Sequence, residues 1–181
     1  HKELFLYAKK LELTCFSSVF DESAIDLLEN LGCCAYKIAS FEATDLELIK
    51  YAASTKKPLI ISTGLASLEE IKELIETLKE TKNKNVIILH CVSSYPASSE
   101  DYNLFTLKHL KQTFDILVGL SDHTLDNISA ITSVSLQVCL IEKHFILNRK
   151  IGGPDSEFSL EPNEFLNLKQ DIKKAYQSMG K

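Results

Sequence analysis

Short apolar runs rich in β-branched residues recur at an almost regular interval along this chain, and their spacing constrains the fold more than any other feature. The runs are Leu11–Ser17, Ala35–Ser40, Pro58–Thr63, Val86–Cys91, Ile116–Ser121 and Cys139–Phe145. Their first residues lie 24, 23, 28, 30 and 23 positions apart, which leaves room for one helix between consecutive runs. Strands that alternate with helices at this spacing predict a parallel sheet built of βαβ units.

The segments between the runs carry the start signals of helices. Ser67 with Glu70, and Thr44 with Glu47, match the capping-box pattern, in which two side chains satisfy the first free N–H groups of a helix. A last amphipathic helix is predicted from about residue 163 to residue 178.

Two architectures fit this pattern: an open doubly wound sheet and a (β/α)8 barrel of which about six units are present. An open sheet gathers its chemistry at one switch point, whereas a barrel collects polar side chains from several strand ends at one mouth. All six predicted strands end in polar residues, and no GxGxxG or Walker loop follows any of them. The sequence therefore favours the α/β barrel, with residues 1–181 as a single domain.

Composition excludes several classes of protein. The chain is 45% hydrophobic and 25% charged, which is typical of soluble globular proteins. Its net charge of −5 and the lack of a dense basic patch argue against nucleic acid as a partner, and no apolar run reaches the roughly 18 residues of a membrane helix. The five cysteines show no CxxC spacing and predict buried thiols in a reducing, cytoplasmic compartment. The only methionine is Met179, so we expect the sequence to be part of a longer chain.

His123 and His144 are the sharpest candidates for chemistry. Each ends a predicted strand, and the two strands are consecutive, so we expect them to be neighbours. Residues two apart on a strand share a face, which places Ser121 with His123 and Glu142 with His144. Two imidazoles near a carboxylate suit a divalent metal such as Mn²⁺, Zn²⁺ or Fe²⁺, and two hydrogen-bonded structural histidines are the alternative. His90 is interpreted first as a hydrogen-bonded histidine of the barrel lining.

Lys37 lies within an apolar strand, where a buried ammonium is costly unless it meets an anion or has a catalytic task. It can form a Schiff base or bind a phosphate or carboxylate, and a lysine that reaches solvent at the strand end is the alternative. Glu42, at the same strand end, is a candidate acid or base. Asp155 follows the last strand in a turn from which it can meet substrate hydroxyls. The hydroxyls near the strand ends suit anion binding better than acyl transfer; they are Ser18, Ser40, Ser62, Thr63, Ser93 and Ser121.

The motifs around these residues resemble those of the sialic acid synthase family, which condenses phosphoenolpyruvate with an amino-sugar. The matching segments, in the family's order, are FSSVFD (16–21), AYKIASFE (35–42), KPLIISTG (57–64), ILHCVSSYP (88–96), VGLSDHTLDN (118–127), IEKHF (141–145) and GGPDSEFSLEP (152–162). The FSS, KIASFE and GGPDSEFS variants are most similar to pseudaminic acid synthases. An N-acetylneuraminate or legionaminic acid synthase is the alternative within the family.

The resemblance implies roles for individual positions. His123 and His144 match metal-binding histidines, with Mn²⁺ as the expected ion and Mg²⁺ or Co²⁺ as alternatives. Glu42 matches the catalytic glutamate near the reacting carbons and the water, and Lys37 matches a residue that holds phosphoenolpyruvate. Ser93 departs from the neuraminate pattern, which has asparagine there. The other positions that match substrate contacts are Ser18, Phe20, Ser40, Ser62, Tyr95, Ser121 and Asp155.

The activity so implied is a metal-dependent condensation of phosphoenolpyruvate with a 2,4-diacetamido-2,4,6-trideoxy-altrose, which gives pseudaminic acid and phosphate by C–O cleavage. The family's first two barrel strands and its C-terminal antifreeze-like domain have no counterpart in this sequence. We therefore expect strands 3 to 8 of the barrel here, a homodimer in the full-length protein, and no activity from residues 1–181 alone. Two rival functions stay open: a Schiff-base aldolase acting through Lys37, and a non-catalytic barrel that binds sugar or metal.

Overall fold

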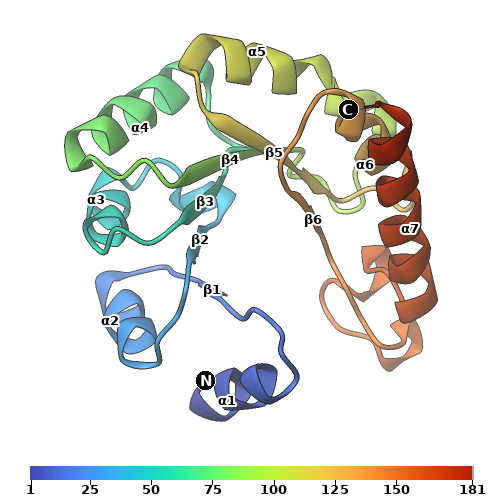
Figure 1. Cartoon of the computed structure of the whole chain (residues 1–181), viewed down its shortest axis with the longest axis horizontal. Coiled ribbons are helices and arrows are strands. Elements are labelled where there is room, and N and C mark those ends of the chain that lie inside the picture. Colours follow the sequence, from blue (N-terminus) through green and yellow to red (C-terminus); the bar gives the residue numbers. More distant parts are fainter. Residues whose placement is uncertain (181) are drawn as a thin grey trace. The chain divides into compact units, whose positions relative to one another are not determined.

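The computed structural model describes residues 1–180 (Figure 1). The chain divides into two compact units. Unit 1 comprises His1–Ile88, and unit 2 begins at Leu89. Strands and helices alternate along both units, and the strands follow one another in the sheet in chain order, β1-β2-β3-β4-β5-β6. Alternating strands and helices with this strand order are the βαβ arrangement that the spacing of the apolar runs predicts.

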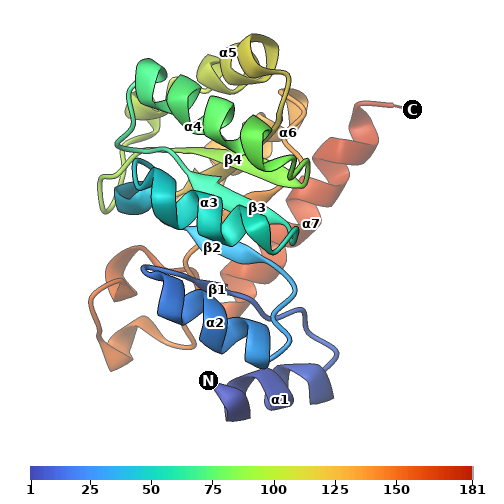
Figure 2. The same cartoon turned by 90° about the vertical axis from the view of Figure 1, so that its left-hand side faces the viewer.

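Unit 1 consists of short parallel strands, each followed by a helix. Its elements are α1 (Lys2–Lys10), β1 (Ser17–Ser18), α2 (Glu22–Asn30), β2 (Tyr36–Ile38), η1 (Ser40–Glu42), α3 (Leu46–Ser54), β3 (Leu59–Ser62) and α4 (Leu68–Thr81). In the parallel register, Lys37 lies opposite Ser18 on one side and Ile60 on the other. Figure 2 shows α2, α3 and α4 side by side along one face of these strands.

The second half of the chain continues the alternation. Strand β4 (Val86–Cys91) crosses the unit boundary, and the elements after it are η2 (Ser99–Tyr102), α5 (Phe105–Phe114), β5 (Leu117–Asp122), α6 (Ile128–Ser135), β6 (Ile141–Lys143), η3 (Arg149–Ile151), η4 (Ser156–Phe158) and α7 (Pro162–Ser178). Strands β5 and β6 are parallel, with Ser121 opposite Glu142 and Asp122 opposite Lys143. Helix α7 packs against α6 (Figure 1).

The two predicted capping boxes have different outcomes. Ser67 caps α4: its Oγ accepts a hydrogen bond from the N–H of Glu70, whose carboxylate accepts one from the N–H of Ser67. The second prediction is wrong, because α3 is capped by Asp45, whose carboxylate accepts from the N–H of Leu48 at 3.0 Å. Asp is at least as good a cap as Thr, and the neighbouring position thus sets the start of the helix.

The first predicted strand, Leu11–Ser17, forms only at its end. Only Ser17 and Ser18 form β1, because the chain turns back at the end of α1 with Glu12 at a φ of 55°. The N–H groups of Leu11 and Leu13 donate to carbonyls of α1, so they are not available to a neighbouring strand. The last predicted strand is likewise shorter and comprises Ile141–Lys143.

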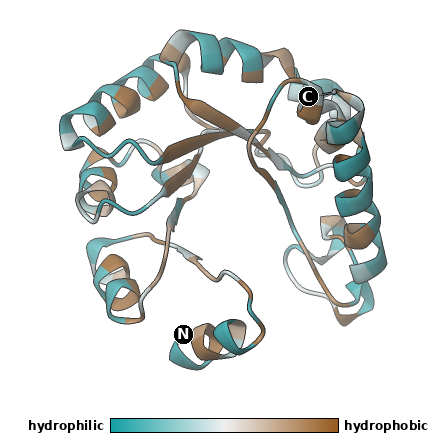
Figure 3. Ribbon diagram, in the orientation of Figure 1, coloured by the Kyte–Doolittle hydropathy of each residue, from teal (hydrophilic) through white to brown (hydrophobic). Residues whose placement is uncertain are grey.

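Apolar residues concentrate on the strands and on the helix faces turned toward them (Figure 3). Glycine at position 119 of β5 has a steric reason: a Cβ there would lie 2.5 Å from Leu89 Cδ2 and 2.7 Å from the carbonyl oxygen of Leu140. Cys33 and Cys91 are buried, whereas Cys34 and Cys139 are exposed, so the prediction of buried thiols holds only in part. Within residues 1–180, no helix is long and apolar enough to cross a membrane.

Candidate functional site

The candidate residues from the sequence fall into two groups, one in each unit. Unit 1 holds Ser18, Phe20, Lys37, Ser40, Glu42 and Ser62. Unit 2 holds Ser93, Tyr95, Ser121, His123, His144 and Asp155. In both groups most members lie at or just beyond the carboxyl end of a strand, where the backbone leaves the sheet and polar side chains can meet a ligand.

Lys37 is the centre of the group in unit 1. Its residue is 8% exposed, and its Nζ donates to Ser62 Oγ at 2.7 Å and to the carbonyl of Ile38 at 3.2 Å. Ser62 reaches it because Lys37 is in register with Ile60, two positions before Ser62 on the same face of β3. The ammonium is buried, so the alternative of a lysine that reaches solvent is wrong.

Glu42 and Ser40 lie on η1, directly after β2. Ser40 Oγ accepts a hydrogen bond from the N–H of Gly64 at 3.2 Å, which ties the loop after β3 to the end of β2. Glu42 Oε2 is buried and has no hydrogen-bond partner among the described residues. A buried carboxylate oxygen without a partner is costly, so it marks a place for a donor such as water or substrate. Phe20, in contrast, is 63% exposed.

His123 and His144 lie side by side in unit 2, as the strand order predicts. The register of β5 and β6 places Ser121 opposite Glu142, and the two histidines follow two positions later on the same face. Their ring centroids are 5.3 Å apart at an interplanar angle of 62°. Ser121 Oγ donates to Glu142 Oε1 at 2.7 Å and thereby links the two strands beneath the histidines.

The hydrogen bonds of His123 define its tautomer. Its Nδ1 lies 2.8 Å from the carbonyl oxygen of Val92, which can only accept, so Nδ1 carries a proton. Burial lowers the pKa of His123 below its ordinary value and favours the neutral ring, which leaves a lone pair on Nε2. Nε2 is 3.4 Å from Ser121 Oγ, whose only proton is directed to Glu142. Acceptor atoms therefore face one another at this point, and such a point suits a cation.

Aromatic rings surround the two histidines. The Tyr95 ring lies 4.4 Å from that of His123 and 5.2 Å from that of Phe158, and Phe158 lies 4.8 Å from His144. Phe158 was not among the candidates from the sequence, although it belongs to the GGPDSEFS segment; it is 5% exposed and forms one wall of the site. Asp155 Oδ2 is 3.6 Å from His144 Nδ1, so this predicted substrate contact also lies beside a histidine.

The histidine pair fits a divalent cation in its donor chemistry. A metal-bound histidine commonly donates its other ring N–H to a carbonyl or carboxylate, as Nδ1 of His123 does to Val92. Within residues 1–180, no three His, Cys, Asp or Glu side chains come together as a metal site. A cation held by His123 and His144 would therefore need further ligands from outside this set of side chains.

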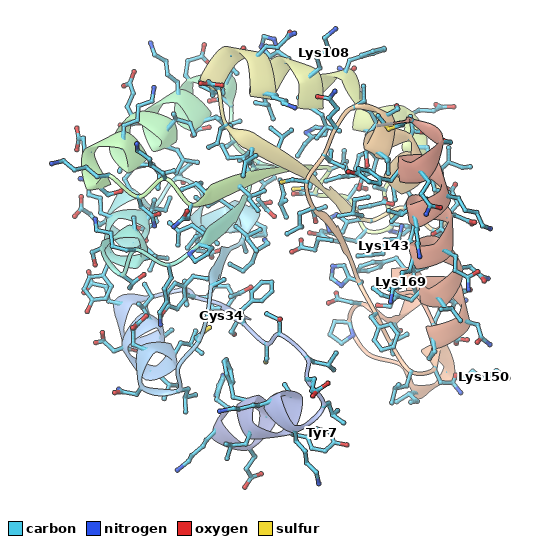
Figure 4. The ribbon with its side chains drawn as sticks, in the orientation of Figure 1. Tyr7, Cys34, Lys108, Lys143, Lys150 and Lys169 are labelled. Carbon is cyan, nitrogen blue, oxygen red and sulfur yellow. The ribbon has the colours of Figure 1, made fainter. Side chains whose placement is uncertain are left out.

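A buried ion pair, which sequence reasoning missed, supports the strands from their other face. Lys143 Nζ lies 2.8 Å from Asp122 Oδ2, with side chains 1% and 0% exposed. The same ammonium donates to the carbonyls of Thr124 and Asp126, and Thr124 N–H donates to Asp122. Figure 4 labels Lys143 beside β6 and Lys108 on the outside of α5. The pair thus holds together the ends of β5 and β6 and the turn after His123.

Tyr102 and His90 form a second buried support. His90 Nε2 is 2.6 Å from the carbonyl oxygen of Tyr102, and burial lowers the pKa of this histidine, which agrees with its interpretation as a hydrogen-bonded residue of the lining. Tyr102 is fully buried, and burial raises the pKa of its phenol. Its hydroxyl donates to the carbonyl of Ser121 at 3.1 Å and accepts from the N–H of His123 at 2.7 Å.

Comparison with known proteins places these residues in a family. The model of the NeuB family matches residues 1–181. A pseudaminic acid synthase of Helicobacter pylori is 44% identical over 180 residues, which cover 99% of this chain and 53% of that protein. An N,N'-diacetyllegionaminic acid synthase of Campylobacter jejuni is 41% identical, with 99% of this chain and 54% of that protein covered. The chain thus spans about half the length of these relatives.

A solved structure supports the fold. The N-acetylneuraminic acid synthetase of Leptospira borgpetersenii, crystallised with citrate, superposes on 99% of this chain and 64% of its own with a TM-score of 0.94 at 32% identity. Together with the parallel strands in chain order, this similarity confirms the prediction of a (β/α)8 barrel of which this chain holds about six units.

Proposed function

The chain belongs to the NeuB family, and from this membership we propose that it carries active-site residues of a nonulosonic acid synthase, most closely a pseudaminic acid synthase. The proposed reaction joins phosphoenolpyruvate to a 2,4-diacetamido-2,4,6-trideoxy-altrose. The observation that carries the proposal is the pair of adjacent histidines, His123 and His144, whose rings lie 5.3 Å apart at the ends of neighbouring strands. The 44% identity to a pseudaminic acid synthase supports the choice of branch.

We assign the anionic substrate to the group in unit 1. The Lys37 ammonium is buried and already held by Ser62 Oγ, so its position is set before a phosphate or carboxylate arrives. A buried cation beside hydroxyl donors binds an anion more strongly than the same groups in water, because the local dielectric constant is lower. Ser18, opposite Lys37 in the register, and Ser40 are further donors in this group.

In the proposed reaction, carbon 3 of phosphoenolpyruvate forms a bond to the aldehyde carbon of the open-chain sugar, whose oxygen gains a proton. Water adds to carbon 2, and the C–O bond to phosphate breaks, so that a nine-carbon acid and inorganic phosphate result. Glu42, with its buried and unpartnered Oε2, is the group that we expect to orient this water and accept its proton. Phe158, which is 5% exposed, and Tyr95 line the histidine pair.

His123 and His144 are the residues that would hold a divalent cation, with Mn²⁺ as the expected ion. When bound, such a cation supplies Lewis acidity toward the sugar's carbonyl oxygen. The protein's own contribution is to keep His123 in the tautomer with a free Nε2, through the bond from Nδ1 to Val92. Asp155 Oδ2 lies 3.6 Å from Nδ1 of His144, the second ring.

The test is phosphate release by the protein in its natural length, with phosphoenolpyruvate and Mn²⁺ and with one sugar per reaction. Release with the 2,4-diacetamido-altrose, abolished by a chelator and restored by Mn²⁺, would establish the proposal. Release only with N-acetylmannosamine, or only with the legionaminic acid precursor, would keep the reaction and overturn the branch. No phosphate release with any of the sugars would overturn the proposed synthase function.

One control separates the proposed synthase from a Schiff-base aldolase. Borohydride with pyruvate traps a lysine imine, so a stable adduct that disappears in Lys37→Met would favour a Schiff-base aldolase. Because the chain spans about half of its relatives, we also expect residues 1–181 alone to show no turnover and the natural protein to be a homodimer. Robust phosphate release by residues 1–181 would contradict the first of these expectations.

A further inference from the structure

Three hydrogen bonds join the segment after β4 to His123. The carbonyl of Val92 accepts from the imidazole Nδ1 at 2.8 Å, and the N–H of Ala97 donates to the carbonyl of His123 at 3.0 Å. The hydroxyl of Tyr102, at the end of the same segment, accepts from the N–H of His123 at 2.7 Å. The ring and both backbone groups of one histidine are thus fixed by a single stretch of ten residues, 93–102, and the residue before it.

The Tyr102 hydroxyl takes the place of a strand neighbour. In a parallel sheet, one residue of the adjacent strand donates to the carbonyl of residue i−1 and accepts from the N–H of residue i+1. The Tyr102 hydroxyl makes both bonds around Asp122: it donates to Ser121 and accepts from His123. On its other side, Asp122 is paired with strand β6, where Lys143 is its partner in the parallel register. Strand β4 ends at Cys91. The Tyr102 hydroxyl therefore provides the hydrogen bonds for the carbonyl of Ser121 and the N–H of His123.

His90 holds the Tyr102 residue in place. Tyr102 is fully buried, and its carbonyl oxygen lies 2.6 Å from His90 Nε2. The His90 and Tyr102 rings also meet edge to face, with centroids 6.2 Å apart. A hydroxyl on an immobilised ring holds its partners more precisely than one on a flexible side chain, because less conformational freedom remains to be lost.

We propose that Tyr102 is a positioning residue that sets the backbone of His123, from which the imidazole projects, for cation binding. The cation-binding part rests on the proposed function, whereas the positioning part rests on the hydrogen bonds alone. Tyr102 is assigned to neither substrate nor cation; it acts through the N–H of His123 and through the carbonyl of Ser121, the residue whose side chain meets Glu142. This role lies outside every motif that identified the family, because Tyr102 belongs to none of the matching segments.

The experiment is Tyr102→Phe in the protein at its natural length, which removes one oxygen and keeps the buried ring. Tyr36→Phe is the matched control: Tyr36 is also fully buried, and its hydroxyl bonds to Glu29 in unit 1. We expect Tyr102→Phe to weaken Mn²⁺ binding about 10- to 100-fold, as loss of a group that orients a metal ligand commonly does. The value of kcat should fall with it, while KM for phosphoenolpyruvate stays within about threefold of wild type. Tyr36→Phe should leave all three unchanged.

A second readout keeps the inference separate from the proposed function. In NMR spectra without metal, the His123 amide and imidazole signals should shift in Tyr102→Phe and stay in place in Tyr36→Phe. Unmoved His123 signals, or unchanged Mn²⁺ affinity in a protein that binds Mn²⁺, would overturn the role of Tyr102. A wild-type protein that binds no Mn²⁺ would overturn the cation-binding part, and the NMR comparison would still decide the positioning part.

If Tyr102→Phe does not fold, the hydrogen bond between Tyr102 and His123 can be tested in the wild-type protein. A buried phenol that bridges two backbone groups has a slowly exchanging hydroxyl proton, which should show a nuclear Overhauser effect to the amide proton of His123. Rapid exchange of that hydroxyl proton with water, or no such effect, would contradict the inference.

Discussion

The two units present opposite kinds of polar group at the ends of their strands. In unit 1, a buried ammonium, Lys37, is held by Ser62 Oγ and a backbone carbonyl, and the hydroxyls near it can donate to an anion. In unit 2, a neutral imidazole, His123, and the carboxylate of Glu142 present acceptor atoms beside Ser121. One set of residues suits an anion and the other suits a cation. The same βα repeat therefore presents two different sets of polar groups.

The two buried lysines make the same contrast in a single residue type. Lys143 is paired with Asp122 and with carbonyls of the following turn, so its charge is used to hold two strand ends together. Lys37 stands beside Ser62 and Ile38 at the end of β2. The comparison teaches that burial alone does not separate a binding lysine from a structural one, because the groups packed around the ammonium decide its role. The first two of the following predictions test this difference, and the other two test a helix cap and a partly exposed ion pair; all four are given in order of decreasing expected effect.

Lys143→Met should give the largest loss, about 3–5 kcal/mol in the free energy of unfolding, because it leaves the Asp122 carboxylate buried without its partner. Urea unfolding followed by circular dichroism measures it. Lys108→Met, on the exposed face of α5 (Figure 4), is the control and should change the free energy by no more than about 0.5 kcal/mol. Equal, small effects at both positions would show that Lys143 has no special structural role.

Lys37→Met should act on substrate binding. A hydrogen bond to a charged group contributes about 1.5–3 kcal/mol, so KM for phosphoenolpyruvate should rise about 10- to 100-fold in steady-state phosphate release. The KM for the sugar should change much less. An unchanged KM for phosphoenolpyruvate would remove Lys37 from the anion site and with it the contrast between the two lysines.

Ser67→Ala should cost about 1 kcal/mol of unfolding free energy, because it removes the acceptor that caps α4 in unit 1. Thr44→Ala is the matched control, since Thr44 occupies the same place in the sequence pattern but Asp45 caps α3. Its expected effect is within about 0.5 kcal/mol. The reverse order of the two losses, in urea unfolding, would mean that α3 begins at Thr44.

Glu164→Gln should have the smallest effect, and one that depends on pH. The Arg149 side chain, with the N–H of Glu161, lowers the pKa of Glu164 to about 2 from the ordinary 4.5. The contribution of the carboxylate is therefore fully present above pH 4.5 and is lost as the pH falls toward 2. The two side chains are 37% and 41% exposed, so it amounts to no more than about 1 kcal/mol.

The measurement is the difference in unfolding free energy between wild type and Glu164→Gln, at pH 7 and again near pH 3. That difference should shrink at the lower pH. Glu157→Gln, at an exposed glutamate in the same unit, should show no such change. A difference that stays constant between the two pH values would indicate that the carboxylate is not held by Arg149.

The sequence alone determined the alternation of strands and helices, because strands and helices have different apolar periods and the intervals between runs fit one helix each. It also predicted that His123 and His144 would be neighbours, since consecutive parallel strands bring their carboxyl ends together and alternate residues share a face. The motifs of residues 118–127 and 141–145 identified the family. These inferences succeed because they depend on local pattern and on order along the chain.

Only the tertiary structure decided which polar groups meet. Lys143 and Asp122 are 21 positions apart in the sequence, and nothing local indicates that the two form a buried ion pair. Tyr102 lies in a short 3-10 helix outside every motif, and its contacts with His123 arise from the path of the loop after β4. The strand prediction over residues 11–17 failed at its start for the same reason, because the N–H groups of residues 11–13 donate to carbonyls of α1. Periodicity reports which face of an element is apolar; the partner of each buried polar group is set by packing between distant segments.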